Sequence, residues 1–276
     1  MKSELRRALL LGRRRPRLIG AGSPTAIRGD GYEFAQLREY VAGDDPRRID
    51  WAATARAGAL QTRVVLEDVA LTLAAIVDRS NSMQLGRSRP LDVAAQEALT
   101  TWYEAAETDD RCVRITSSGV HAPPALRGRR SALVCSNVGD NQPFVLQRAL
   151  DMARCALGAG AALLVVSDFY DLKENDVPLL RRLSRRLDCT ALVARDPWFD
   201  HLPLRGFVTI CDAESAAQRR LFIGEPERRR YRCAVMKREH ELRKLFHTAG
   251  WRTGALQERD GRGSLYNAFG IPSAVA

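Results

Sequence analysis

The stretch from Leu71 to Met83 constrains the fold of this chain more than any other. It reads Leu-Thr-Leu-Ala-Ala-Ile-Val-Asp-Arg-Ser-Asn-Ser-Met, an almost continuous apolar run that ends in polar residues. Such a run is typical of a strand buried on both faces, as in a parallel sheet. Because ligands in such sheets bind beyond the carboxyl ends of the strands, Asp78, Ser80 and Ser82 are expected at a binding edge.

These three side chains form a set of hard oxygen donors. A carboxylate followed by two hydroxyls at spacings of two suits Mg²⁺ or Ca²⁺ much better than a soft metal. The alternative is structural. In it, Asp78 simply ends the strand while Ser80 or Ser82 caps the next helix.

A second apolar run occurs at residues 161–168, reading Ala-Ala-Leu-Leu-Val-Val-Ser-Asp, and it too ends in a carboxylate, Asp168. Hydrophobic spacing predicts helices at 90–107, 144–157, 176–187 and 227–249, further strands at 111–117 and 190–194, and a hairpin from 206–211 and 218–223. This order predicts an α/β fold with a doubly wound, mostly parallel, Rossmann-like sheet and one crevice. Asp168 either faces that crevice or serves as an N-cap or turn residue.

The basic residues are concentrated at the start of the chain. Residues 1–28 hold eight Lys or Arg residues and one acid, so most of the net charge of +10 belongs to this stretch. It is predicted to be a basic flexible tail, either solvated or able to touch nucleic acid or an anionic surface. No apolar run is long enough for a transmembrane helix, and we expect a cytoplasmic protein. Six scattered cysteines without a Cys-x-x-Cys pair are interpreted as reduced core residues rather than zinc ligands.

Residues 29–66 form a polar segment ahead of the predicted α/β domain at 67–276. Turn formers bracket carboxylates, guanidiniums and an indole in the sequence Gly-Asp-Asp-Pro-Arg-Arg-Ile-Asp-Trp from Gly43 to Trp51. Arg pairs bidentately with carboxylates, so one reading is an internal network that locks an irregular extension onto the domain. The other reading is a partner-docking surface formed by Arg38, Asp44, Asp45, Arg47, Arg48, Asp50, Trp51 and Arg56.

Two resemblances rest on these motifs. Asp78-x-Ser80-x-Ser82 after an apolar strand resembles the metal-ion-dependent adhesion site (MIDAS) of von Willebrand factor A domains. Together with Gly-x-Gly-Tyr-Glu-Phe-x-x-Leu-Arg-x-Tyr from Gly29 and Gly-Asp-Asp-x-Arg-x-Ile-Asp-Trp-x-x-x-Ala-Arg from Gly43, it resembles the bacterial domain-of-unknown-function family fifty-eight, a von Willebrand A-like family associated with MoxR-type AAA+ ATPases.

The resemblance implies a metal site of Asp78, Ser80, Ser82 and Asp168 that holds Mg²⁺, or Mn²⁺ or Ca²⁺ in its place. The adhesion site normally adds a threonine from the loop before the helix that precedes the Asp168 strand. Here that loop reads Gly-Asp-Asn-Gln-Pro at residues 139–143 and contains no threonine. One missing hydroxyl is expected to weaken metal binding.

A non-enzymatic interaction module is the leading functional hypothesis. No phosphate-binding glycine loop or nucleophile elbow occurs in the sequence. If Asp78 were a phosphatase-like nucleophile, Ser80 would stand where an acid is needed to protonate the leaving group, and a hydroxyl is a poor general acid. The family resemblance implies a MoxR-type ATPase and a client protein as partners. The alternative is a nucleic-acid or anionic-surface binder that uses residues 1–28, whose affinity would fall steeply with salt.

Overall fold

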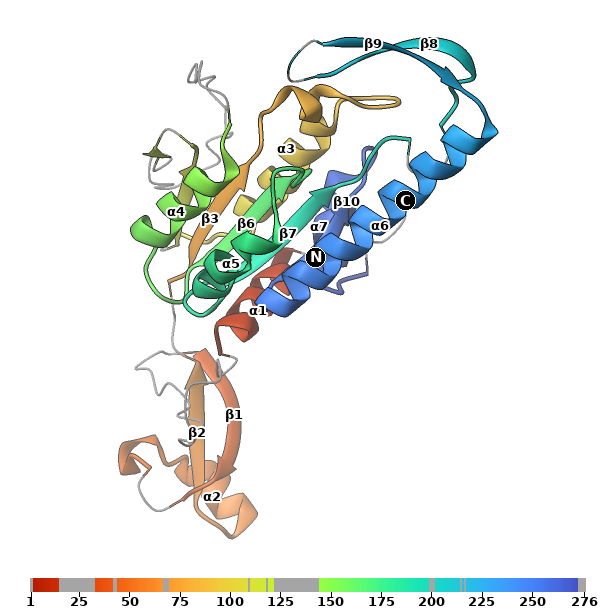
Figure 1. The fold of residues 1–276 in the computed structure, drawn as a ribbon. Helices are drawn as coiled ribbons and strands as arrows, with labels where there is room; N and C mark the ends of the chain where they lie inside the picture. The colour runs from red at the N-terminus through yellow and green to blue at the C-terminus, as the bar shows by residue number, and fades with distance from the viewer. Residues whose placement is uncertain are drawn as a thin grey trace. The chain divides into compact units, whose positions relative to one another are not determined.

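The computed structural model describes residues 2–14, 33–41, 44–66, 70–108, 110–117, 119–121, 144–198, 202–213, 215 and 217–272. The chain forms two compact units (Figure 1). One comprises Met1–Arg15 together with Leu71–Ala276, and we call it the α/β unit. The other, the small unit, comprises Pro16–Ala70.

A mostly parallel sheet forms the centre of the α/β unit. Its strands are β3 (Thr72–Val77), β4 (Arg111–Ile115), β5 (Val120–His121), β6 (Ala162–Ser167), β7 (Asp188–Ala194) and β10 (Arg252–Leu256). Their order is β10-β7-β6-β3-β4-β5, and all neighbours are parallel except β4 and β5. The predicted doubly wound, mostly parallel α/β sheet is therefore confirmed.

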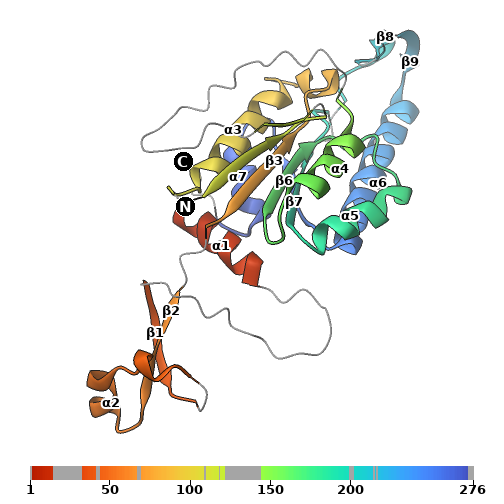
Figure 2. The ribbon, with the colours of Figure 1, turned by 90° about the vertical axis from the view of Figure 1, so that its left-hand side faces the viewer.

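Helices cover both faces of this sheet (Figure 2). Residues of α1 (Lys2–Arg14), α3 (Leu91–Glu104) and α7 (Gly261–Ala268) share one apolar core with β3 and β6. On the opposite face, α4 (Leu146–Ala156), α5 (Val177–Ser184) and α6 (Glu225–Ala249) contribute to a second core. The two central strands are buried on both faces, which is why their sequences are continuously apolar rather than alternating.

The chain winds outward from β3 in both directions. It passes first to β4, and then returns to the other side of β3 to form β6, β7 and β10 in turn. The order therefore reverses between β3 and β6. In open α/β sheets such a reversal leaves a crevice at the carboxyl ends of the strands. This topology puts Asp78 and Asp168 on either side of that crevice.

The expected flexible tail is wrong for Lys2–Arg14, because these residues form helix α1 of the α/β unit. Leu5 and Leu9, four residues apart, lie on one face and are 0% and 1% exposed. Nζ of Lys2 lies 2.9 Å from Glu104, and the Arg6 guanidinium pairs with Glu107 at 2.9 Å and with Asp110. Residues 15–28 lie outside the described residues.

The sequence predicted an irregular extension, but the small unit has regular secondary structure. Strands β1 (Glu33–Glu39) and β2 (Gln61–Leu66) pair antiparallel, and helix α2 (Trp51–Ala57) lies between them in sequence after the short 3-10 helix η1 (Pro46–Arg48). Asp45 and Asp50 cap η1 and α2 by accepting hydrogen bonds from Arg47 N–H and Ala53 N–H. That this segment packs onto the α/β unit stays a prediction.

The other helices and strands that the sequence predicted are present in the structure. Strands β8 (Gly206–Cys211) and β9 (Gln218–Ile223) form the expected hairpin, and α6 ends at Gly250, whose φ of 76° suits a residue without a side chain. The interpretation of the cysteines holds in part. Cys112 and Cys189 are buried, but Cys155, Cys211 and Cys233 are exposed, and all five are free. No helix in the described part of the chain is both long and apolar enough to cross a membrane.

Candidate metal site at the carboxyl edge of the sheet

The four predicted metal ligands meet at the carboxyl ends of β3 and β6. Asp78 directly follows β3, and its N–H donates to the carbonyl of Val166 at 2.9 Å, so the pairing of the two strands continues to their last residues. Asp168 follows β6 directly. Two carboxylates far apart in the sequence therefore lie at one edge because parallel neighbouring strands end there together.

A chain of hydrogen bonds connects the four residues. The Ser80 N–H donates to Oδ1 of Asp78 at 2.8 Å, and the two serine hydroxyls lie 2.9 Å apart. The Ser82 hydroxyl donates to Oδ2 of Asp168 at 2.6 Å. The structure thus brings together all four residues that the sequence selected.

The helix-capping alternative is wrong for the serines. Ser80 stands at the N-cap of the short 3-10 helix η2 (Asn81–Gln84), but its side chain makes no capping hydrogen bond. Pro90 occupies the N-cap position of α3, the next α-helix. The side chains of Ser80 and Ser82 are directed instead into the network with the two aspartates.

Ser167 is a member of this site that the sequence analysis missed. Its buried hydroxyl donates to Oδ2 of Asp78 at 2.6 Å and accepts the Phe169 N–H at 3.0 Å. Only the pairing of β3 with β6 reveals the contact. The sequence signal was a polar residue at the last position of an otherwise apolar strand.

The environment of Asp78 disfavours its ionised form. The residue is only 4% exposed. Burial raises the pKa of its carboxyl group, hydrogen bonds from Ser167 and Ser80 oppose that rise, and the nearby charge of Asp168 adds to it. A cation placed between the two carboxylates would relieve both the desolvation and the repulsion.

The donor set fits a hard divalent cation. Asp78 and Asp168 offer carboxylate oxygens, and Ser80 and Ser82 offer hydroxyls within the same network. Among the described residues, no group of three or more His, Cys, Asp or Glu side chains is arranged to hold a metal. A metal site in this network would therefore depend on the serine hydroxyls. The loop at 139–143, which lacks the threonine, lies outside the described residues.

The candidate docking residues of the small unit fall into two groups. The carboxylates are used internally: Asp44 is buried and accepts from Arg38 at 2.7 Å and from the Val41 N–H at 3.0 Å, and Asp50 pairs with Arg63 at 2.8 Å. This part of the segment is an internal network, as one of the two readings predicted.

The other group lies at the surface of the small unit. Trp51 is 68% exposed, which is unusual for an indole. Arg47 and Arg56 are exposed as well, although the Arg56 side chain donates to the carbonyl of Ala52 in its own helix. Arg48 is partly buried. Since Trp and Arg are enriched at binding hot spots, the docking reading remains a prediction for these residues.

Known proteins resemble this chain in sequence over most of its length. The curated relatives include Uncharacterized protein Rv1480 of Mycobacterium tuberculosis (strain H37Rv) and Uncharacterized protein Mb1516 of Mycobacterium bovis. Each is 29% identical over an alignment of 208 residues that covers 71% of this chain and 65% of the relative. This chain thus matches less than two thirds of the length of these relatives.

Two solved structures are similar at lower identity. One is the conserved hypothetical protein BatB from Bacteroides thetaiotaomicron, with a TM-score of 0.39 and 12% identity over 72% of this chain and 94% of the other. The second is an aerotolerance-related membrane protein from Bacteroides fragilis, with a TM-score of 0.40 and 13% identity over 73% and 96%. The model of the family described as "Protein of unknown function DUF58" matches residues 36–242, so this chain belongs to the DUF58 family.

Proposed function

We propose that the α/β unit is a non-enzymatic protein-interaction module with a metal-ion-dependent adhesion-type site. Asp78, Ser80, Ser82 and Asp168 would hold a divalent cation, with Mg²⁺ as the first choice and Mn²⁺ or Ca²⁺ as substitutes. The observation that carries the proposal is the continuous hydrogen-bonded network that joins these four residues at the carboxyl ends of β3 and β6. The bound cation would supply positive charge to which an acidic side chain of a partner can bind.

Two further polar groups beside the site, the Ser167 hydroxyl and the Tyr170 N–H, have supporting roles in this proposal. Ser167 holds Asp78 from the inside, leaving Oδ1 on the side of Ser80. The Tyr170 N–H donates to Oδ1 of Asp168 at 3.1 Å and orients the second carboxylate. Such fixed orientation lowers the cost of assembling a binding site when the ion arrives.

The partner system is inferred from the family resemblance alone. We infer a MoxR-type AAA+ ATPase, with this chain acting beside it in the cytoplasm in the assembly or maturation of other proteins. The von Willebrand A-like identity of the fold belongs to the same inference. The alternative, binding of nucleic acid or anionic surfaces through residues 1–28, is less well supported for two of the eight basic residues, because Lys2 and Arg6 pair with acids of the α/β unit.

A thermal-shift series tests the metal site. At a Mg²⁺ concentration ten times the dissociation constant, binding to the folded state alone stabilises it by about 1.4 kcal/mol, which raises the Tm by about 3–6 °C for a protein of this size. We expect this rise for the wild type and for the control Asp171→Ala, which removes an exposed acid on the same turn. Asp78→Ala and Asp168→Ala should not respond. If all four proteins respond equally, the proposed metal site is wrong.

A further inference from the structure

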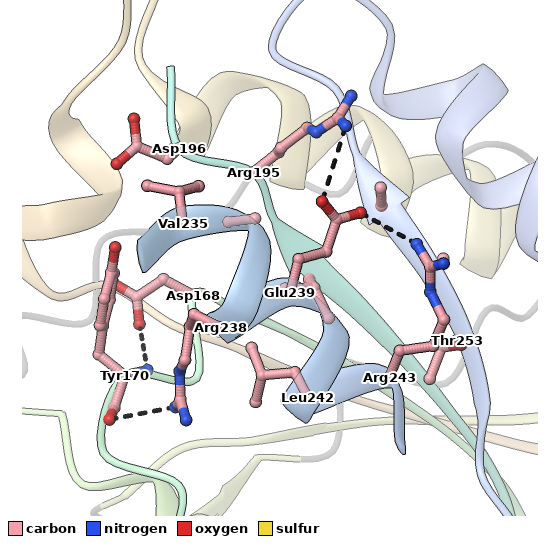
Figure 3. A pocket seen from close by; sticks show the side chains of 14 residues that line it. Asp168, Tyr170, Arg195, Asp196, Val235, Arg238, Glu239, Leu242, Arg243 and Thr253 are labelled. Atoms are coloured by element: carbon pink, nitrogen blue, oxygen red, sulfur yellow. Dashed lines mark hydrogen bonds and ion pairs between the residues drawn. The ribbon is translucent and has the colours of Figure 1, made fainter. Parts of the chain in front are cut away.

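A pocket of about 170 Å³ lies beside Asp168 in the α/β unit (Figure 3). It is bounded by the inner side of α6 and by the carboxyl-terminal parts of β7 and β10. Much of its wall is aliphatic, formed by Val193, Val235, Leu242 and Ala255. The pocket and the candidate metal site therefore share Asp168 as a common wall.

The charged groups around the pocket make ion pairs or hydrogen bonds within the protein. The Glu239 carboxylate lies 3.0 Å from the Arg243 guanidinium and 3.7 Å from that of Arg195, as Figure 3 shows. Asp196 accepts a hydrogen bond from the hydroxyl of Tyr231. Because these groups already have partners within the protein and much of the wall is aliphatic, the surface that the pocket can offer to a ligand is chiefly carbon. This favours an apolar occupant over an ionic one.

Arg238 connects the pocket wall to the turn that presents Asp168. Its guanidinium donates to the carbonyl oxygens of Phe169, Tyr170 and Leu172, at 3.3 Å and 3.1 Å for the last two. Phe169 adopts a positive φ of 56°, which is uncommon for a residue with a side chain. Its ring packs edge-on against Phe246 of α6 at 4.9 Å. Helix α6 thus lines the pocket and also contacts Phe169, the residue that follows Asp168.

The volume limits the size of the occupant. Sites for drug-sized molecules and cofactors usually measure about 300–1,000 Å³, so this pocket is too small for a nucleotide. An apolar cavity of about 150 Å³ holds one benzene molecule. A single leucine or phenylalanine side chain is therefore the size of group that fits.

We propose that the pocket receives one apolar side chain, the size of leucine or phenylalanine, from a partner protein whose acidic residue binds at Asp78 and Asp168. The placement of the acidic residue rests on the proposed function, whereas the preference of the pocket for an apolar group does not. Interfaces commonly combine a desolvated apolar anchor in a pocket with neighbouring polar contacts. The pocket would thus favour partner proteins that carry an apolar residue close to the acidic residue that binds at the metal site.

Methyl-detected NMR of the full chain tests the pocket directly. Without metal, N-acetyl-leucinamide and N-acetyl-phenylalaninamide should shift the methyl signals of Val193, Val235 and Leu242 saturably. N-acetyl-alaninamide should bind at least fivefold more weakly because it leaves most of the pocket empty. If the pocket methyls do not respond to the larger amides, the proposal is overturned.

Two filling variants and one matched control assign the binding to this pocket. Ala255→Leu and Val235→Phe place extra carbon in the pocket from opposite walls, and each should weaken binding of the leucine amide at least tenfold. Ala234→Leu adds the same side chain as the first variant at an exposed position of α6 that does not line the pocket, and should bind like the wild type. Two folded filling variants that bind like the wild type would overturn the proposal.

Short peptides test whether the pocket belongs to the partner site. In Mg²⁺, an acetylated peptide with aspartate joined to leucine through zero to two glycines should bind at least tenfold more tightly than the leucine amide alone. Asp78→Ala should remove this gain and leave binding of the amide unchanged. If no linked peptide binds more tightly, the pocket is not part of that site. If Mg²⁺ does not raise the Tm of the wild type but the leucine amide still binds, only the proposed metal site is contradicted.

Discussion

Shortening Leu9 tests whether Lys2–Arg14 is part of the folded α/β unit. Leu9 is 1% exposed and belongs to the core that α1 shares with α3, α7 and the sheet. Leu11 lies two residues further along the same helix and is 54% exposed. The substitutions Leu9→Ala and Leu11→Ala therefore change helix propensity alike and differ in the core contacts that they remove.

The structure sets the expected difference. Replacing a buried leucine by alanine costs about 2–5 kcal/mol, from the lost transfer energy and the cavity left behind. A change at an exposed position costs within about 0.5 kcal/mol. We expect Leu9→Ala to lower the free energy of unfolding by about 3 kcal/mol and Leu11→Ala to leave it almost unchanged.

Urea unfolding of the full chain measures both values. With a slope of about 1–3 kcal/mol per molar urea, a loss of 3 kcal/mol lowers the midpoint by about 1–3 M. Leu5→Ala should behave like Leu9→Ala, because Leu5 is fully buried on the same helix face. Equal midpoints for Leu9→Ala and Leu11→Ala would show that α1 does not pack on the sheet, and the flexible-tail interpretation would then be restored.

Three further predictions concern charged and exposed side chains. Burial opposes ionisation of Glu258, but hydrogen bonds from Ser88 and from the N–H groups of residues 87–89 outweigh it and lower its pKa to about 2. After allowance for solvent screening, Glu258→Ala should therefore lower the free energy of unfolding by on the order of 1 kcal/mol at pH 7. Urea unfolding should show this stability difference between wild type and variant vanishing as the pH falls from about 4.5 towards 2. Burial raises the pKa of Asp78, so its ionisation destabilises the folded protein as the pH rises. In EDTA, Asp78→Asn should therefore gain stability relative to the wild type between pH 4 and 7. A stability difference between the two proteins that does not change with pH would contradict the burial argument. In the small unit, Asp44→Ala should destabilise the segment by about 1–3 kcal/mol and therefore accelerate amide hydrogen exchange in β1 and β2. Trp51→Ala should leave the exchange rates unchanged, because Trp51 is exposed. Equal effects of the two substitutions would refute the assignment of Asp44 to the internal hydrogen-bond network.

Hydrophobic pattern alone was sufficient to predict the four central strands of the sheet, β3, β4, β6 and β7, and most of the helices that cover it. The runs at β3 and β6 are apolar throughout because both faces of a central parallel strand are covered, and a pattern with that local cause is visible in sequence. The same runs end in Asp78 and Asp168, so the position of each candidate ligand followed from its place at the end of a strand. That both acids belong to one site was one of two readings of Asp168 and was implied by the family resemblance, and the hydrogen-bonded network agrees with it.

Tertiary structure decided the features that depend on contacts between distant parts of the chain. Helix α1 has a basic composition typical of a solvated end, and only the burial of Leu5 and Leu9 against α/β-unit residues from 71 onwards shows that it is part of the core. Ser167 reaches Asp78 only because β3 and β6 are neighbours, and Arg238 reaches the turn after Asp168 from a helix that begins more than fifty residues later. Local sequence propensity cannot predict such contacts, because their free energy arises only when the fold brings both partners together.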